Sequence, residues 1–285
     1  MLDKQTYLKQ NKKMNMKSLL LLVIFHFSGV LIYAQNFPKD TLRYEITYDY
    51  SYQVNKEDTL SKQKEQMALY VAKDFSYYIS LNQKKLLDMA REYEVSKVLP
   101  DRKALSRSKI NYTIVKEYST SKSTLIDRIG QGTYTYNQDL DKFDWKLQEG
   151  QKEILGYVCK KATTQFAGRT YVAWYTTEIS IADGPYKFHG LPGLILSIYD
   201  TNKHYQFTVS SIKNSSSFCN TGEQLQKPTQ ITYEEYKQLK KRYKEKPSTL
   251  INSGGMTFPK EMLDLADQRA KEKMKFENNP MELTD

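Results

Sequence analysis

Residues 42–54, Leu-Arg-Tyr-Glu-Ile-Thr-Tyr-Asp-Tyr-Ser-Tyr-Gln-Val, decide the fold of this 285-residue chain. Every second residue from Leu42 to Val54 is aliphatic or aromatic, and the residues between them are polar or charged. An alternation with a period of two is typical of a β-strand that buries one face. Such a strand would extend over about 40 Å, which is longer than a flat sheet in a chain of this size normally holds. The stretch therefore predicts a long strand in a sheet that curves around a core.

Shorter stretches of strand character follow along the chain. They lie at residues 66–72, 75–81, 112–118, 133–136, 154–166, 170–177, 194–199 and 204–212. Short, turn-rich connections between the later strands are typical of antiparallel neighbours. A helix is predicted at residues 83–99, capped by Asn82 and ended by Pro100. The predicted fold class is mainly β (α+β): a curved, half-barrel-like antiparallel sheet with one internal helix and a helical C-terminal extension.

The C-terminal region has a different composition from the strands before it. Thr232 and Glu235 form a capping box ahead of a helix at residues 233–246, and Pro259 can open a second helix. The basic residues of the first helix form either a basic face or an ordinary solvated surface: Lys237, Lys240, Lys241, Arg242, Lys244 and Lys246. We therefore divide the chain into a leader at residues 1–34, a β-rich domain at 35–222 and a charged helical extension at 223–285.

The leader has the order of a signal peptide. A basic stretch precedes an apolar run from Leu19 to Ile32, which is shorter than the roughly 20 residues that a membrane-spanning helix needs. Cleavage is predicted after Ala34, and an uncleaved N-terminal anchor is the alternative. Met14 and Met16 are alternative starts to Met1. The predicted protein is periplasmic or secreted and is not an integral membrane protein.

The net charge is less informative than it first looks. The 43 Lys and Arg residues against 33 Asp and Glu give a charge of +10, and removal of the leader takes away five Lys and one Asp, which lowers the charge to +6. A charge of this size in an exported protein favours solubility over nucleic-acid binding. No nucleic-acid partner is predicted.

Two cysteines, Cys159 and Cys219, remain in the part that would be exported. Disulfides persist in an oxidising compartment. A bridge between them would close a long loop and stabilise the fold by about 4 kcal/mol in the chain-entropy model. Two separate thiols are the alternative, because spacing alone does not show that the residues meet.

Residues suited to catalysis are few. After the leader the chain has only His189 and His204, and it lacks the spacings of zinc hydrolases, phosphate-binding loops and serine-nucleophile turns. Asn137, Asp139 and Asp141 are spaced like the first ligands of a calcium loop, but the glycine at the sixth position and the acid at the twelfth are missing. No catalytic residue, metal or cofactor is predicted.

Residues 183–198 concentrate three glycines and two prolines within ten positions. The sequence Leu191-Pro192-Gly193-Leu194 predicts a type II turn with a positive φ at Gly193. The segment is either a stiff corner that plugs one end of the curled sheet or an apolar docking surface at the lip of a cavity. The candidate contact residues are Gly184, Pro185, Phe188, His189, Gly190, Leu191, Pro192 and Gly193.

Tyrosine is the most unusual feature of the composition, since 21 of the 23 tyrosines follow the leader. Tyrosine suits strands, so these residues belong either to the core or to a surface that stacks sugars or peptides. The candidates for lining an apolar cavity on the concave face are Tyr44, Ile46, Tyr48, Trp174 and Phe207.

The string Gly-Leu-Pro-Gly-Leu-Ile at residues 190–195, with Gly-Pro at 184–185, resembles the signature of the GLPGLI family, exported proteins of Bacteroidota. Residues 155–162, 168–169 and 173–176 resemble that family's lead-in to the motif. The resemblance implies an exported, β-rich protein of a Gram-negative cell envelope. It implies no catalytic residue, because the family has no established activity.

Three functional hypotheses follow. The first is a cell-envelope binding module whose concave face holds an apolar small molecule or a segment of a protein partner, with the turn at 191–193 shaping one end. The second is a hydrolase that uses converging carboxylates with His189 as acid or base, which requires Asp183 or another acid within hydrogen-bonding reach. The third is a structural partner of an outer-membrane protein. A concave face filled by the chain's own side chains would exclude the apolar ligand.

Overall fold

The computed structural model describes residues 39–97, 108–220, 227–251 and 258–283. The leader at 1–34, its cleavage site and the alternative starts lie outside these residues. Within the described ranges, none of the helices combines the length and the hydropathy that crossing a membrane requires.

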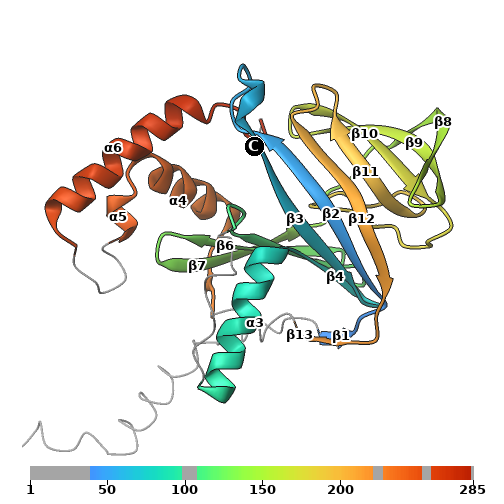
Figure 1. Ribbon diagram of the computed structural model, residues 1–285, viewed down its shortest axis with the longest axis horizontal. Helices are drawn as coiled ribbons and strands as arrows, with labels where there is room; N and C mark the ends of the chain where they lie inside the picture. The colour runs from blue at the N-terminus through green and yellow to red at the C-terminus, as the bar shows by residue number, and fades with distance from the viewer. Residues whose placement is uncertain (1–38, 98–107, 221–226, 252–257, 284–285) are drawn as a thin grey trace, which may run out of the picture. The chain divides into compact units, whose positions relative to one another are not determined.

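One sheet dominates the described part of the chain, in the order β14-β7-β6-β5-β4-β3-β2-β12-β11-β10-β9-β8 (Figure 1). Its strands are β2 (Tyr44–Gln53), β3 (Lys62–Val71), β4 (Phe75–Ser80), β5 (Tyr112–Glu117), β6 (Lys122–Ile129), β7 (Gly132–Asp139), β8 (Lys146–Ile154), β9 (Tyr157–Phe166), β10 (Arg169–Thr176), β11 (Leu194–Asp200), β12 (Tyr205–Asn214) and β14 (Thr229–Gln230). Neighbours are antiparallel, except that β14 pairs in parallel with β7. A separate pair joins β1 (Lys39–Thr41) to β13 (Phe218–Asn220). The predicted mainly β fold is confirmed.

Residues 44–53 of the alternating stretch form β2, near the middle of the sheet between β3 and β12. Ile46 and Tyr48 are fully buried, whereas Asp49 between Tyr48 and Tyr50 is exposed. The period of two therefore marks the buried face, as predicted.

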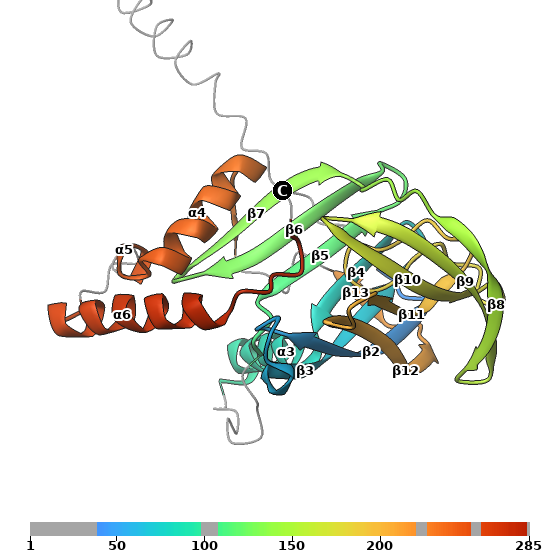
Figure 2. The same ribbon diagram turned by 90° about the horizontal axis from the view of Figure 1, so that it is seen from above.

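The sheet curls along its length (Figures 1 and 2). Register shifts occur where β12 pairs with β2, where β10 pairs with β11 and where β8 pairs with β9. Each such irregularity bends a strand and increases its local twist. The predicted curvature is thus produced by local breaks in pairing rather than by uniform bending of β2.

Two long strands, β6 and β8, and the short strands β1, β13 and β14 were absent from the sequence-based prediction. The residues of β6 are buried on both faces, so its apolar residues follow one another without alternation. Most residues of β8 are exposed, so its sequence lacks the alternation of apolar and polar residues that marks a half-buried strand. The single strand expected at 154–166 also splits, because Leu155 and Gly156 both adopt positive φ and turn the chain between β8 and β9.

The helices lie close to their predicted positions. The internal helix is α3 (Leu81–Ser96), whose N-cap is Ser80 rather than Asn82 and which ends at Lys97 in the left-handed conformation. The capping box of Thr232 and Glu235 is present at α4 (Tyr233–Glu245). The remaining helical elements are η1 (Thr59–Ser61), α5 (Ser248–Ile251) and α6 (Lys260–Phe276). Contacts join α4 to β7, α5 and α6.

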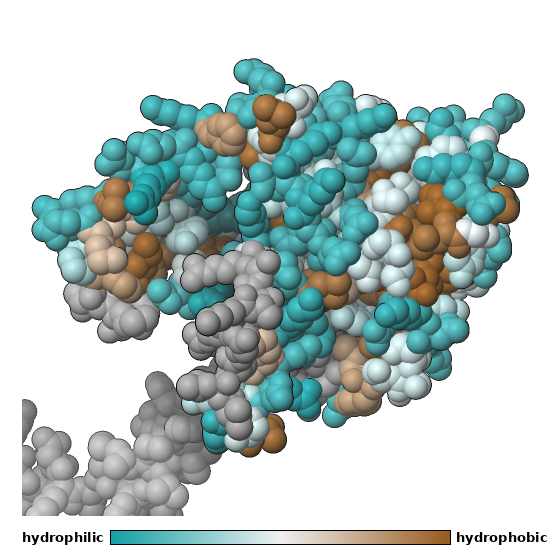
Figure 3. All heavy atoms as spheres, in the orientation of Figure 1, coloured by the Kyte–Doolittle hydropathy of each residue, from teal (hydrophilic) through white to brown (hydrophobic). Residues whose placement is uncertain are grey.

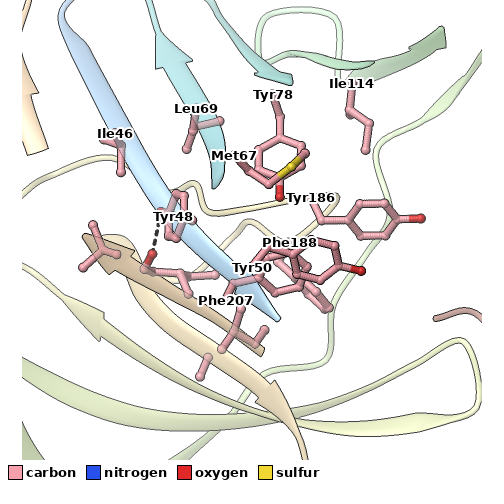
Figure 4. Packing of buried hydrophobic residues seen from close by; sticks show 14 of the residues in the cluster. Ile46, Tyr48, Tyr50, Met67, Leu69, Tyr78, Ile114, Tyr186, Phe188 and Phe207 are labelled. Carbon is pink, nitrogen blue, oxygen red and sulfur yellow. Dashed lines mark hydrogen bonds between the residues drawn. The ribbon is translucent and has the colours of Figure 1, made fainter. Parts of the chain in front are cut away.

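The core lies on both faces of the sheet. On the outer face, Phe75, Tyr77 and Ile79 of β4 form a small cluster, against which Leu87 of α3 packs. The inner, concave face carries the main cluster, in which the rings of Tyr50 and Phe207 stack with centroids 4.4 Å apart (Figure 4) and Phe188 packs against Tyr171 at 4.7 Å. Around Ile46, Tyr48 and Phe207 the concave face is therefore filled by the chain's own side chains.

The segment between β10 and β11 is held inside the curl by a buried ion pair. Lys116 of β5 and Asp183 are both fully buried, and the ammonium group donates to the Asp183 carboxylate and to the carbonyl oxygens of Gly184 and Phe188. The same carboxylate accepts hydrogen bonds from the Tyr118 hydroxyl at 2.6 Å and the Gly184 N–H at 2.7 Å. Burial lowers the pKa of Lys116 below its usual value, and the neighbouring Asp183 opposes that shift.

The turn at 191–193 is tighter than the predicted type II turn. The Gly193 N–H donates to the Leu191 carbonyl at 2.7 Å, and the Leu194 N–H donates to Ile179 instead of closing the turn. Gly193 has φ +154, and a Cβ placed there would lie 1.9 Å from the Thr176 carbonyl oxygen. The glycine is thus required by close backbone contact as well as by its conformation.

Residues 277–283, which we call the C-terminal strap, return to the sheet after α6. Arg169 at the start of β10 donates to the carbonyl oxygens of Met281 at 3.0 Å and Pro280 at 2.7 Å, and to the Asn279 side chain at 2.7 Å. Its guanidinium also pairs with the buried carboxylate of Asp200 at 3.1 Å. One planar cation therefore fixes the path of the strap.

Substitution of Gly193 by Ala is expected to lower the free energy of unfolding by about 3 kcal/mol or more, because backbone must move to admit the methyl group. Gly156→Ala is the control: it also has a positive φ, but a Cβ there meets nothing within 4 Å, so only the conformational cost of about 1 kcal/mol remains. Urea denaturation measures both. Equal losses in the two variants would contradict the close contact at Gly193.

Lys116→Met is expected to lower the free energy of unfolding by about 3–5 kcal/mol, because it leaves the Asp183 carboxylate buried without its cation. Adding Asp183→Asn to this variant should restore part of the loss by removing the charge. The control is Lys122→Met, which breaks the exposed pair with Asp139 and should leave the denaturation midpoint unchanged. A Lys116→Met protein as stable as the wild type would refute the role given to the ion pair.

Arg169→Lys is expected to release the strap, because an ammonium group cannot reproduce the planar fork of hydrogen bonds. The Leu283 amide, which donates to Ala167 at 2.9 Å, should exchange its hydrogen about tenfold faster or more. Arg128→Lys, at an exposed position of β6, is the control. Unchanged protection of the Leu283 amide in Arg169→Lys would show that the strap is held by other contacts.

Candidate functional site

A cavity of about 1210 Å³ lies between the sheet, α4, the end of α6 and the C-terminal strap. Figure 3 shows the surface hollowed between these helices and the strands, with mostly hydrophilic residues around the hollow. Tyrosines from four strands, from the segment between β10 and β11 and from α4 line the cavity: Tyr50, Tyr52, Tyr112, Tyr136, Tyr186, Tyr205, Tyr233 and Tyr236.

Local structure explains why these rings converge. Tyr50 and Tyr52 lie two residues apart on β2, so they point to the same face, and their rings stack with centroids 4.9 Å apart. Tyr233 and Tyr236 lie one helical turn apart on α4, and both rings contact Tyr136 of β7, at 5.1 and 4.8 Å. The strand period and the helix period thus direct tyrosines from both sides into one space.

Some of the tyrosine hydroxyls are used within the protein. Tyr186 donates to Glu282 at 2.6 Å, Tyr236 donates to Asp127 at 2.8 Å, and Tyr205 donates to the Asn279 carbonyl. These bonds hold the strap and α4 against the sheet.

Other hydroxyls have no such role. Tyr52, Tyr112 and Tyr136 make no side-chain hydrogen bond to any part of the chain that the structure describes. Burial raises the pKa of Tyr52 to about 12 and that of Tyr112 well above its usual value. These groups therefore stay protonated at neutral pH and can donate a hydrogen bond to a bound molecule.

Charged groups complete the lining. They comprise Lys109, Lys187, Lys237, Lys240, Lys241, Lys244, Lys273, Glu234, Glu277 and Glu282. Flat rings alternate here with hydrogen-bonding groups, so the cavity offers stacking and polar recognition at once. Among the residues that the structure describes, no three His, Cys, Asp or Glu side chains come close enough together to hold a metal ion.

The sequence-predicted cavity residues lie elsewhere. Ile46, Tyr48 and Phe207 are fully buried in the inner core, and Tyr44 and Trp174 pack at its margin. None of these five residues lines the 1210 Å³ cavity. The hypothesis of an apolar ligand held by these residues is wrong, because their part of the concave face is occupied by protein.

The candidate contact residues between β10 and β11 also belong largely to the core. Phe188 and Leu191 are buried, and Gly184, Pro185 and Gly193 are buried with them, while Gly190 and Pro192 are exposed. A Cβ at Gly184 would lie 2.8 Å from the Ile195 side chain. The segment is thus the stiff corner, and its apolar residues do not form an exposed docking surface.

His189 is in no position to act with Asp183. The two residues form an isolated β-bridge through their backbones, and the Asp183 carboxylate is occupied by Lys116, Tyr118 and the Gly184 N–H. His189 lines a second cavity, of about 580 Å³, where its Nε2 is buried without a partner among the described residues. Burial and the nearby Lys116 lower the pKa of His189 below 6.5, so the ring is neutral at neutral pH. The hypothesis of a hydrolase built on this pair is wrong.

The two cysteines are separate. Cys159 on β9 and Cys219 on β13 are both buried free thiols. They belong to different hydrophobic clusters, Cys159 to the inner one and Cys219 to the outer one. The alternative of two unpaired thiols therefore describes the structure, and the bridge is not formed.

Sequence reasoning missed most of the tyrosines of the site. Tyr112, Tyr136 and Tyr186 are far apart along the chain, and no periodic pattern relates them. A usable signal existed only on α4, where Tyr233 and Tyr236 share a helix face with Lys237 and Lys240.

The comparisons with known proteins agree on one relationship. The family model described as "N-glycanase peptide, N-terminal domain" matches residues 50–238. Two solved structures of PNGF-II, in different crystal forms, share the fold, with TM-scores of 0.53 and 0.52 at 16% and 17% identity. Each covers 70% of this chain, and this chain spans about a third of the PNGF-II chains, 33% and 32%. A search of curated protein sequences found no match.

These findings overturn the assignment to the GLPGLI family that residues 190–195 suggested, and with it the picture of a cell-envelope binding module for an apolar ligand or protein partner. The motif lies within the matched residues, where it forms the packed corner of the sheet. The family model covers more than half of the chain. The chain therefore belongs to the family of the N-glycanase peptide N-terminal domain.

Proposed function

We propose that this chain is a glycan-binding module that holds the saccharide part of a glycopeptide in its tyrosine-lined cavity. The observation that carries the proposal is the convergence of eight tyrosines, from strands, loop and helix, on one cavity of about 1210 Å³. A pyranose ring has flat faces of C–H groups and a rim of hydroxyls. It therefore needs aromatic surfaces and hydrogen-bonding groups side by side.

The size and polarity of the cavity suit such a ligand. Its volume exceeds the range of about 300–1,000 Å³ that is usual for sites of single small molecules. The unengaged hydroxyls of Tyr52, Tyr112 and Tyr136 are available as donors, and the lysines of α4 add further donors. An apolar molecule would leave these polar groups without partners, which is unfavourable.

The family relationship supports the same proposal. The description of the matching family names an N-glycanase and a peptide, which suits a ligand made of a glycan and a peptide. The matched region corresponds to about a third of PNGF-II, so we assign binding to this chain and not the activity of the whole enzyme. Export of the chain to the periplasm or beyond, predicted from its leader, would place it where glycoproteins occur.

The test uses a short peptide that carries one neutral biantennary N-glycan, titrated into the protein in a calorimeter. The double variant Tyr112→Leu with Tyr233→Leu removes rings from both walls of the cavity and is expected to weaken binding by about tenfold or more, or ~1.4 kcal/mol. Tyr112→Phe removes only the hydroxyl and should lose less.

Trp174→Leu is the matched control, because Trp174 is a half-buried aromatic residue that does not line the cavity. It should bind the glycopeptide as the wild type does, and thermal unfolding should show all variants folded. Failure of the wild type to bind the glycopeptide, or equal weakening by Trp174→Leu, would refute the proposal. The same peptide without its glycan separates saccharide from peptide recognition.

A further inference from the structure

The cavity carries a strong excess of positive charge. Seven lysines and three glutamates line it. Four of these lysines lie on α4 at positions i, i+3, i+4 and i+7: Lys237, Lys240, Lys241 and Lys244. Such spacing places them along one side of the helix, the side that faces the cavity. Arg242 and Lys246, the other basic residues of this helix region, do not line it.

Several of the lysines are neutralised within the protein. Lys240 pairs with Asp127 at 3.0 Å, Lys237 with Glu234 at 3.1 Å and Lys273 with Glu277 at 3.6 Å. Lys241 and Lys244 form no ion pair with any residue that the structure describes. Two uncompensated ammonium groups therefore stand at the α4 wall.

The opposite wall already binds a carboxylate. Glu282 of the C-terminal strap lines the cavity, and its Oε1 accepts a hydrogen bond from the Tyr186 hydroxyl at 2.6 Å and pairs with Lys187 at 2.8 Å. Tyr186 and Lys187 are themselves buried. A tyrosine hydroxyl beside an ammonium group is thus shown, in this cavity, to hold a carboxylate.

The α4 wall also carries tyrosine hydroxyls and ammonium groups, but two of its lysines have no carboxylate of the described residues beside them. Tyr233 and Tyr236 lie on the same helix as Lys241 and Lys244, and all four line the cavity. A cleft with walls of low polarizability and one sign of charge concentrates its field on whatever enters it. A neutral ligand would gain nothing from this field, whereas an anionic group would be attracted by it.

We infer that the cavity selects acidic oligosaccharides, in which a carboxylate or sulfate group of the saccharide pairs with Lys241 and Lys244. This inference rests on the proposed function and names its ligand class. The shared chemistry is a saccharide ring that bears an anionic group, whether from a sialic or uronic acid or from a sulfate ester. A nucleic acid is disfavoured because Lys241 and Lys244 share the lining of the cavity with Glu234, Glu277 and Glu282, which would repel a phosphate backbone.

The experiment compares two glycopeptides that differ only in charge: the neutral biantennary form and its disialylated counterpart, with a sulfated form of the same glycan as a third arm. The wild type is expected to bind the acidic forms about tenfold or more tightly than the neutral one, and the difference should shrink as salt increases. Lys241→Gln with Lys244→Gln should weaken binding of the acidic forms about tenfold and weaken binding of the neutral form much less, because each glutamine keeps N–H donors but loses the charge.

The matched control replaces two exposed lysines outside the cavity, Lys160→Gln with Lys213→Gln, which lowers the net charge by the same amount. It should keep the preference for acidic glycans. Preference for only the sialylated or only the sulfated form would support the inference and identify the anionic group.

Several outcomes would overturn it, and they are separable from failure of the proposed function. Equal binding of acidic and neutral forms would refute charge selection while glycan binding stands. Absence of binding to all forms would refute the proposed function itself. Displacement of the acidic glycopeptide by inorganic phosphate at equal concentration, or tighter binding of a single-stranded oligonucleotide of equal charge, would show a general anion or nucleic-acid site instead.

Discussion

The buried ammonium group of Lys116 constrains the rest of the structure. A fully buried cation is tolerated only where acceptors surround it, and its acceptors here are the Asp183 carboxylate and the carbonyl oxygens of Gly184 and Phe188. All three belong to the segment between β10 and β11, so that segment must cross the inside of the curled sheet to reach β5. Once it does, Phe188 and Leu191 fill the concave face, and the turn at Gly193 must pass within contact distance of Thr176.

This arrangement explains where a ligand can and cannot bind. With the concave face filled, the remaining open space lies at the side where the sheet meets α4 and the C-terminal strap. That space is formed by segments that are remote in the sequence, and Arg169 and Asp127 hold two of them in place through the strap and α4. The strap also contributes Glu282 to the lining of the cavity. The segment that Arg169 holds against the sheet therefore also forms part of the cavity wall.

The GLPGLI-like string illustrates how a sequence motif acquires its form from packing. The Thr176 carbonyl leaves no room for a side chain at Gly193, and the side chain of Ile195 leaves none at Gly184. Leu191 is buried. These requirements come from the curled sheet and the ion pair beneath it, and they say nothing of a ligand. The chemistry of the protein lies instead in tyrosines and lysines that belong to no local motif.

The elements that have a regular period could be predicted from the amino-acid sequence alone. The alternation in residues 44–53 predicted β2 and its buried face, and the capping box of Thr232 and Glu235 predicted α4, because each depends on contacts within a few residues. Only the tertiary structure decided that β6 is buried on both faces, that Cys159 and Cys219 remain apart, and that the five predicted cavity residues are core or its margin. Only it brought Tyr52, Tyr112, Tyr136 and the lysines of α4 around one cavity. Periodicity shows which side of an element is apolar, whereas a site depends on which elements meet, and that is set by long-range pairing and buried charge.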